Sequence, residues 1–334
     1  MVEGALTRRT AERLIEAATA APSLHNSQPW RFVARLADRV IEIYADPSRT
    51  LRRGDPRGRA VHIACGSALF NLRLAVAQAG CEPVARLLPS QHDPLLLASV
   101  RLAGPYRPRP AERDLYAAIR HPAGRGPFTA RPLTRGLMSA LREAAALEGA
   151  SLRELDQTDA LRMLRRSAAA DPGLRADPGY LAAVAAWAGG RQQSGQVPGK
   201  RPTGEVLTVR GLPAGPGTGL PPAMREASSQ LVVISTGADD RASWLRAGQA
   251  AQRVLLLATH RGVRAAPLSL ALEAASPPAG TLAGGEPALA GEHPAVILRL
   301  GCGQQGPATA RRPVAQVLRV VPGQGNLTAL PVTA

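Results

Sequence analysis

The sequence is poor in cysteine, aromatic residues and lysine. Three cysteines occur in 334 residues; no two form a CxxC pair, and none lies at metal-ligand spacing from a histidine. This usage favours a reducing compartment over a disulfide framework or a metal site. Aromatic residues make up 3% of the chain, and Lys200 is the single lysine among 41 basic residues.

Positive charge is in excess, and arginine carries it. The formal net charge is +16 at pH 7, which is typical of proteins that bind anionic surfaces. However, the arginines are scattered through every segment, and the aromatic residues that stack on bases are scarce. We interpret the arginine excess as codon bias in a GC-rich genome and expect no nucleic-acid partner.

No apolar run approaches the ~18 residues that a membrane span needs. Glu12 and Glu16 interrupt the apolar stretch near the start of the sequence, so it does not fit a signal peptide. The pattern predicts a cytoplasmic protein without a membrane partner. An apolar content of 45% and this length suit about two units of ~150 residues.

Helix and strand patterns alternate in the first third of the chain. A helix over residues 10–21 is stopped by Pro22, and a long helix is followed by Gly80. The segments with these patterns are a helix over 10–21, strands over 31–34 and 40–45, a helix over 60–79, and strands over 84–88 and 95–102.

Two internal matches predict a duplicated unit. Residues 141–146 (LREAAA) match 14–19 (LIEAAT) at an offset of 127. In the long helix, five positions match at an offset of 182: Gly66, Ala68, Leu72, Leu74 and Gly80 with Gly248, Ala250, Val254, Leu256 and Gly262. The alternative is coincidence between Ala/Leu-rich helices. A duplicated unit would bury within one chain the surface that a homodimer buries, so a monomer is expected.

Two long stretches rich in glycine and proline stand apart from these units. Residues 189–222 and 276–294 are longer than ordinary connections, which favours functional covers or solvated insertions. The first is a candidate lid.

Most familiar catalytic motifs are missing. No phosphate-binding P-loop, GxGxxG after a strand, GxSxG or HExxH pattern is present. Polar residues gather instead in the loop Ser23-Leu24-His25-Asn26-Ser27-Gln28-Pro29-Trp30. These neutral donors and acceptors suit a planar, hydrogen-bonding ligand. The alternative is a capped turn with Trp30 in the core.

A second candidate is the basic turn that contains Arg311 and Arg312 ahead of Pro313. Two adjacent guanidinium groups can bind a phosphate bidentately, although surface salt bridges would also explain them.

Several motifs, in this order, resemble the Acg-type family of nitroreductase-like flavoproteins. They are APSLHNSQPW (21–30), DPRGR (55–59), CGSALFNLRLA (65–75), WLRAGQA (244–250), LLLAT (255–259) and ARRPV (310–314). The resemblance covers nearly the whole chain. It implies an α+β, nitroreductase-like fold duplicated within one chain, with halves at 1–115 and 116–334, that imitates the nitroreductase homodimer.

The resemblance also implies that FMN binds in one of two pseudo-symmetric sites, with 189–222 as the lid. The first copy alone has the SLHNSQPW loop, since the second reads LEGASLRELD. Carried over by motif, the flavin-binding residues are Ser23, His25, Asn26, Ser27 and Gln28, with Arg125, Arg311 and Arg312 on the phosphate side. No catalytic side chain is required, because the cofactor carries the redox chemistry. His25 is expected to position the ring, although it could also donate to a bound acceptor.

Two motifs differ from the family pattern. Arg120-His121-Pro122-Ala123-Gly124-Arg125 stands where relatives show Arg-x-Thr-Asn-Arg, and Ser194-Gly195-Gln196-Val197-Pro198 replaces Asp-Gly-x-Pro in the lid. The resemblance implies an FMN-dependent NAD(P)H oxidoreductase that works by ping-pong transfer to a small-molecule acceptor. The alternative is a non-catalytic protein that sequesters FMN beneath a closed lid.

Overall fold

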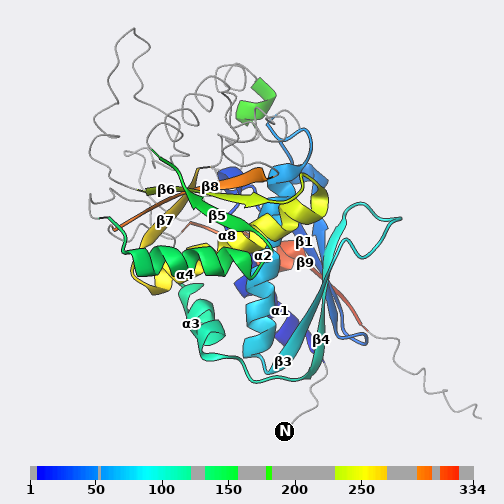
Figure 1. Cartoon of the computed structure of the whole chain (residues 1–334). Coiled ribbons are helices and arrows are strands. Elements are labelled where there is room, and N and C mark those ends of the chain that lie inside the picture. The colour runs from blue at the N-terminus through cyan, green and yellow to red at the C-terminus, as the bar shows by residue number, and fades with distance from the viewer. Residues whose placement is uncertain are drawn as a thin grey trace, which may run out of the picture.

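The computed structural model describes residues 6–51, 54–121, 132–156, 178–182, 230–268, 292–302 and 309–322. In this part of the chain, two mixed α/β layers lie on either side of a central pair of helices, α2 and α8 (Figure 1). The predicted α+β class is confirmed.

The first layer is a five-stranded sheet with the order β3-β4-β2-β1-β9. Its strands are antiparallel except that β9 pairs with β1 in parallel. The elements of this layer are α1 (Arg8–Thr19), β1 (Trp30–Arg35), β2 (Val40–Ala45), α2 (Arg59–Gln78), β3 (Cys81–Leu87), β4 (Leu96–Pro105) and, from the end of the chain, α9 (Val314–Val317) and β9 (Leu318–Val321).

The second layer repeats this arrangement with four strands in the order β5-β6-β8-β7. Both layers have a register shift in the equivalent strand, between Ile43 and Tyr44 in β2 and between Ile234 and Ser235 in β6. Its elements are α4 (Arg135–Ala146), β5 (Ser151–Glu154), β6 (Gln230–Thr236), α8 (Arg241–His260), β7 (Arg264–Leu268) and β8 (His293–Gly301), and α3 (Pro110–Ala118) joins the layers.

Helices α2 and α8 cross at two glycines related by the offset of 182. A Cβ at Gly66 would overlap the carbonyl oxygen of Leu245, and a Cβ at Gly248 would overlap that of Ile63. Ile63 and Leu245 are themselves 182 residues apart, so the contact is reciprocal. Such a contact is what a two-fold interface requires.

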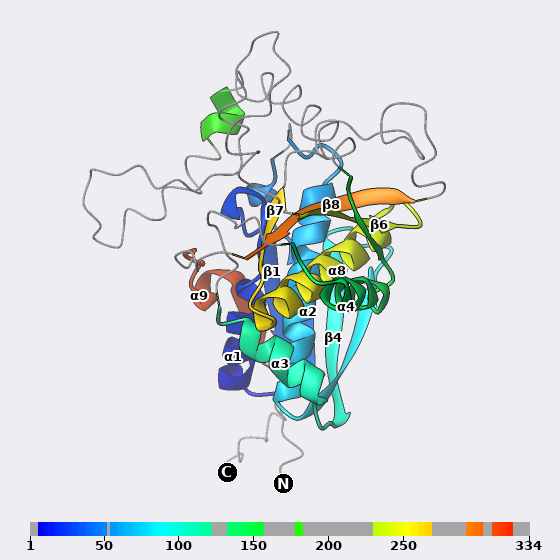
Figure 2. The same cartoon turned by 60° about the vertical axis from the view of Figure 1, so that its left-hand side comes forward.

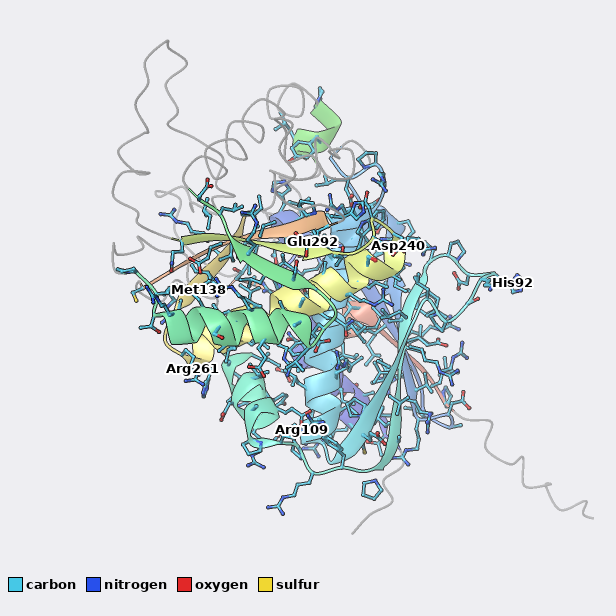
Figure 3. All side chains as sticks on the ribbon, viewed as in Figure 1. His92, Arg109, Met138, Asp240, Arg261 and Glu292 are labelled. Atoms are coloured by element: carbon cyan, nitrogen blue, oxygen red, sulfur yellow. The ribbon has the colours of Figure 1, made fainter. Side chains whose placement is uncertain are left out.

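A second reciprocal contact lies at the ends of these helices. Arg59, at the start of α2, donates to the carbonyl of Pro294, and Arg241, at the start of α8, donates to the carbonyl of Pro94. Figure 3 shows α8 crossing the molecule from Asp240 at one end to Arg261 at the other. These equivalences are compatible with the predicted internal duplication.

Strand β9 crosses the boundary between the predicted halves. Its residues belong to the second half, yet it extends the sheet of the first half beside β1. Figure 2 shows α9 beside α1, ahead of this strand. The division at residue 115 therefore stays a prediction. Strand β9, which comes from the second predicted half, completes the first sheet.

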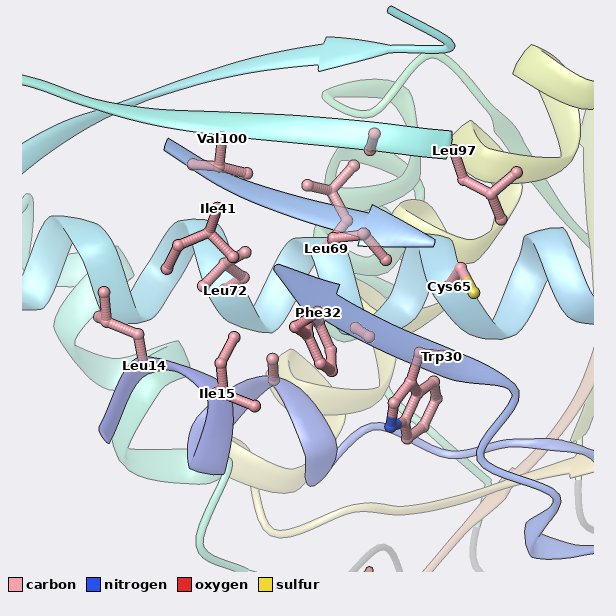
Figure 4. Packing of buried hydrophobic residues seen from close by; sticks show 14 of the residues in the cluster. Leu14, Ile15, Trp30, Phe32, Ile41, Cys65, Leu69, Leu72, Leu97 and Val100 are labelled. Atoms are coloured by element: carbon pink, nitrogen blue, oxygen red, sulfur yellow. The ribbon is translucent and has the colours of Figure 1, made fainter. Parts of the chain in front are cut away.

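The first core lies between α1, α2 and one face of the first sheet. In β1, Trp30, Phe32 and Ala34 alternate inward, because successive strand residues face opposite sides. They meet Ile15 of α1 and Leu72 of α2, and all five are at most 1% exposed (Figure 4). A second core joins α4, α8 and the second sheet, and Phe70 belongs to a smaller cluster where α2, α3 and α8 meet.

Helix α2 is the one helix, among the described residues, that is long and apolar enough to cross a membrane. Most of its apolar stretch is buried inside the protein, between α1, α8 and the first sheet. Its composition is therefore explained by its place in the core.

Candidate functional site

The loop between α1 and β1 has an unusual backbone. Residues 24–26 form one turn of 3-10 helix, and His25, Asn26 and Gln28 have φ values of 49°, 59° and 49°. The left-handed region costs residues other than glycine about 1–2 kcal/mol each. The loop must therefore be held in place by its surroundings.

Contacts to the end of the chain hold two of these residues. The Asn26 side chain donates from Nδ2 to the carbonyl of Ala310 (3.1 Å) and accepts from Nη1 of Arg311 (3.2 Å). Gln28 Oε1 accepts from the backbone N–H of Arg312 (2.8 Å). Within the loop, Ser23 Oγ accepts from the backbone N–H of Gln28 (2.9 Å).

His25 is held from a third direction. Its Nε2 lies 2.7 Å from the hydroxyl of Tyr180, which belongs to the described segment 178–182. The loop is thus held by the end of the chain and by the connection between β5 and β6.

The Arg311 guanidinium group joins the loop to the end of α1. Its Nε and Nη2 donate to the carbonyls of Thr19 and Ala20, each at 2.9 Å. These carbonyls lie at the C-terminal end of α1, where the helix leaves backbone acceptors unpaired. These contacts indicate that Arg311 positions the loop as well as adding charge.

Arg312 belongs to a cluster of charged residues beneath the loop. Its Nη1 lies 3.3 Å from the Gln28 carbonyl oxygen and 3.6 Å from a carboxylate oxygen of Asp46. Asp46 also accepts from Arg31 at 2.8 Å, and Arg49 donates to the carbonyl of Ser27. Among the described residues, the guanidinium groups of Arg31, Arg49 and Arg312 therefore lie around the carboxylate of Asp46.

Burial strengthens the electrostatic interactions within this cluster. Burial alone would raise the pKa of Asp46, but hydrogen bonds from Arg31 and Ser48 outweigh it and lower that pKa below its ordinary value. The pKa values of Arg49 and Arg312 are lowered, mainly by burial and, for Arg49, also by the charge of Arg312. Arginines stay protonated, so the geometry favours an anion beside Arg49 and Arg312.

The equivalent connection in the second layer differs in length and in its side chains. The connection between α4 and β5 spans only residues 147–150, whereas that between α1 and β1 spans 20–29. In the shorter connection, the buried carboxylate of Glu148 accepts from Arg73 (2.6 Å) and Arg253 (2.8 Å). Both guanidinium groups at this position are therefore bound to a carboxylate of the same chain.

The structure thus brings together most of the residues predicted from sequence. Side chains of Ser23, His25, Asn26 and Gln28 and the carbonyl of Ser27 make the loop contacts, together with Arg311 and Arg312. Arg125 and the candidate lid at 189–222 lie outside the described residues.

Sequence reasoning missed Asp46, Arg49 and Tyr180. The first two stand in a turn, Asp46-Pro47-Ser48-Arg49, directly after β2, and a charged turn at a strand end is a usable signal. Tyr180 has no local signal, because it lies 155 residues from His25.

Among the described residues, no group of three or more His, Cys, Asp or Glu side chains could hold a metal ion.

Comparison with known proteins identifies the family of this chain. No family model matches the chain. A Mycobacterium tuberculosis (strain ATCC 25618 / H37Rv) protein named "Putative NAD(P)H nitroreductase Rv3131" is 31% identical over 92% of this chain and 91% of its own length. The chain belongs to the Acg-type family of NAD(P)H nitroreductase-like proteins. The protein named "Putative NAD(P)H nitroreductase acg", from the same strain, is 29% identical over 96% of this chain and 98% of its own length.

Solved structures similar to this family member include nitroreductases. A nitroreductase with bound FMN from Desulfitobacterium hafniense DCB-2 is 11% identical, covers 60% of this chain and 94% of its own, and has a TM-score of 0.36. A nitroreductase-like protein from Bacillus cereus is 14% identical, covers 62% of this chain and 95% of its own, and has a TM-score of 0.35.

Proposed function

We propose that this protein is an FMN-dependent NAD(P)H oxidoreductase that reduces a small-molecule acceptor by ping-pong turnover. One observation carries the proposal: the guanidinium groups of Arg49 and Arg312 lie against the backbone of a polar, preorganised loop, in a chain of the NAD(P)H nitroreductase-like family. The order of substrates, the site residues and the number of cofactors are part of this proposal.

The residues present fit FMN chemically. Its phosphate is close to a dianion at neutral pH, and the guanidinium groups that lie around Asp46 would complement that charge. We assign the phosphate to Arg312 and Arg49, with Arg125 expected on the same side. The flavin ring needs neutral donors and acceptors, which the loop 23–28 supplies.

When bound, FMN would supply hydride acceptance and donation, which is the whole of the redox chemistry. The side chains would then bind, orient and exclude water. Arg311 and Tyr180 hold the loop, and the polar groups of residues 23–28 would orient the flavin ring and donate hydrogen bonds to it. A separate catalytic acid or base is not needed.

We further propose one FMN per chain, a monomer that contains its own pseudo-dimer, and a cytoplasmic location without nucleic-acid or membrane partners. Only the first layer has the ten-residue loop, and Glu148 with its two arginines stands at the equivalent position of the second. Residues 189–222 remain the candidate lid.

Anaerobic mixing of the FMN-loaded protein with NADH or NADPH tests the proposal. We expect the absorbance of oxidised flavin to bleach with one or both nucleotides, and an added nitroaromatic acceptor or quinone to restore it. Initial rates at several acceptor concentrations should give the parallel double-reciprocal lines of ping-pong kinetics. A protein that binds FMN but is reduced by neither nucleotide would instead support the sequestering alternative.

A further inference from the structure

Tyr180 reaches the candidate site from the long connection between β5 and β6. Its hydroxyl lies 2.7 Å from Nε2 of His25, and the two rings meet edge to face with centroids 5.7 Å apart. On another side, the ring comes so close to Gly54 that a Cβ at that position would be 3.1 Å from Tyr180 Cε2. The tyrosine ring therefore fits between the imidazole and the bare backbone of residue 54.

This contact adds to the interactions that hold the loop. Asn26 and Gln28, both left-handed, are bound by residues 310–312. His25 is also left-handed, and its Nε2 is hydrogen-bonded to the hydroxyl of Tyr180. A backbone that costs free energy persists only when the surroundings fix it.

We propose that Tyr180 is a positioning residue of the flavin site. Its hydroxyl holds the His25 imidazole and, through it, the left-handed turn at residue 25, so that the loop 23–28 is ordered before the flavin arrives. This inference rests on the proposed function, because it assigns the loop to the flavin ring. It also makes the site depend on both halves of the chain.

The bond has a second effect, on the protons of His25. A neutral imidazole donates through one nitrogen and accepts through the other, and the partner of Nε2 selects between the two tautomers. The hydroxyl of Tyr180 fixes the direction of the ring and, because a phenol donates more strongly than it accepts, favours the tautomer in which Nε2 accepts. Phenylalanine at 180 would keep the ring contact and lose this control.

The test compares Tyr180→Phe with a matched control, Tyr106→Phe. The Tyr106 hydroxyl also makes hydrogen bonds, to Glu112 at 3.0 and 2.9 Å, but it lies after β4, away from the loop. Flavin affinity is measured by fluorescence titration with FMN and, separately, with riboflavin. The His25 ring nitrogens are followed by 15N NMR in the flavin-free protein.

We expect Tyr180→Phe to weaken FMN and riboflavin by the same factor, about 3- to 10-fold, because a hydrogen bond is lost at the loop and not at the phosphate. The His25 ring nitrogens should shift as the tautomer balance changes. Tyr106→Phe should alter neither quantity. Gly54→Ala, which presses on the tyrosine ring from the other side, should reproduce both effects.

Unchanged affinities and unchanged His25 resonances in Tyr180→Phe would overturn the proposal. A loss confined to FMN would also overturn it, since that result would place Tyr180 at the phosphate. If the unaltered protein binds neither flavin, the proposed function fails, and the NMR comparison still decides whether Tyr180 fixes His25. A urea unfolding curve for each variant shows that it is folded.

Discussion

At the scale of single residues, the loop 23–28 is held by groups from distant parts of the chain. Three left-handed residues cost about 1–2 kcal/mol each, and a hydrogen bond returns about 0.5–1.5 kcal/mol. Several bonds are therefore needed, and they come from Tyr180 and residues 310–312. The loop owes its shape to tertiary contacts rather than to its own sequence.

The two adjacent arginines should behave differently when replaced. Arg312→Ala removes charge-assisted hydrogen bonds worth about 1.5–3 kcal/mol, so FMN affinity should fall at least ~10-fold while riboflavin affinity barely changes. Arg311→Ala removes the hydrogen bonds between the loop and the end of α1, so it should lower the affinity for both FMN and riboflavin. Fluorescence titration of each variant with both flavins measures this.

Arg319→Ala is the matched control for that experiment. Arg319 lies on β9, a few residues further on, and its side chain is exposed. The substitution Arg319→Ala removes one positive charge without changing a contact of the loop. The affinities for FMN and for riboflavin should therefore stay within about twofold of those of the original protein. Equal losses of FMN and riboflavin in Arg312→Ala would show that Arg312 is structural.

The sequence predicted the polar loop more clearly than it predicted the residues that hold the loop in place. Neutral polar side chains between Pro22 and Pro29 are a local pattern, and local patterns can be read from one segment. The contact between His25 and Tyr180, and the backbone carbonyls that Arg311 binds, arise only on folding. A carbonyl has no sequence signature, so the positioning role of Arg311 was not predictable.

At the scale of elements, the crossing of α2 and α8 fixes how the two layers meet. Gly66 and Gly248 let the helix backbones touch, and Ser67 Oγ donates to the Gly248 carbonyl at 3.0 Å across the same crossing. The glycine spacing predicted a repeated unit from the sequence, but not that the two helices cross at these glycines. Strand β9 was not predicted. It has only four residues, and because it pairs in parallel with a strand that is distant in sequence, no hairpin turn lies beside it.

Alanine at either crossing glycine should destabilise the protein strongly and to a similar degree. The added methyl group overlaps backbone atoms, which cannot rotate away, so Gly66→Ala and Gly248→Ala should each cost about 3 kcal/mol or more. Gly136→Ala in α4 is the control, since a Cβ there meets nothing within 4 Å. It should be neutral or stabilise by at most about 1 kcal/mol, as measured by urea unfolding.

A large cost for Gly66→Ala with none for Gly248→Ala would contradict the reciprocal contact. Residues 63 and 245 would then differ in how freely they can shift, and the two-fold relation of the helices would be only approximate.

His62 gives the same interface a pH dependence. Its Nδ1 donates to the Gly58 carbonyl (2.6 Å), and its Nε2 accepts from Nε of Arg241 (3.0 Å), so the ring is held neutral. Burial, helped by the Arg241 charge, lowers the pKa of His62 below its ordinary 6.5. The unfolded chain therefore binds this proton more readily than the folded protein does.

Protonation of His62 therefore favours the unfolded chain. The contribution of His62 to stability is complete above pH ~6.5 and is lost as the pH falls from there through the lower pKa of the folded state. Urea unfolding between pH 7.5 and 5.5 should show a steeper loss of stability in the original protein than in His62→Gln. His92→Gln, at an exposed histidine, should leave the slope unchanged, and an equal slope in all three proteins would contradict the prediction.

At the scale of the whole molecule, two layers of the same topology carry different sites. One has a ten-residue loop above an excess of arginine, and the other has a four-residue connection in which Glu148 is bound by Arg73 and Arg253. The net charge of +16 is spread over the chain, so it does not by itself mark the site. Arg312 is distinguished by its burial beside Asp46 and the loop.

This asymmetry predicts one FMN per chain in a monomeric protein. The second position lacks the loop that would hold a flavin ring, and its two arginines are bound to the buried carboxylate of Glu148. Native mass spectrometry of the loaded protein should therefore give the mass of one chain and one FMN, and absorbance should give the same ratio. Glu148→Gln is the informative variant, because it removes the negative charge from these arginines but restores no loop. This variant should still bind one FMN. It should be less stable than the original protein, because a neutral amide is a weaker partner for Arg73 and Arg253 than a carboxylate is. Two tightly bound flavins per chain, in either protein, would show that the second layer holds a working site despite its short connection.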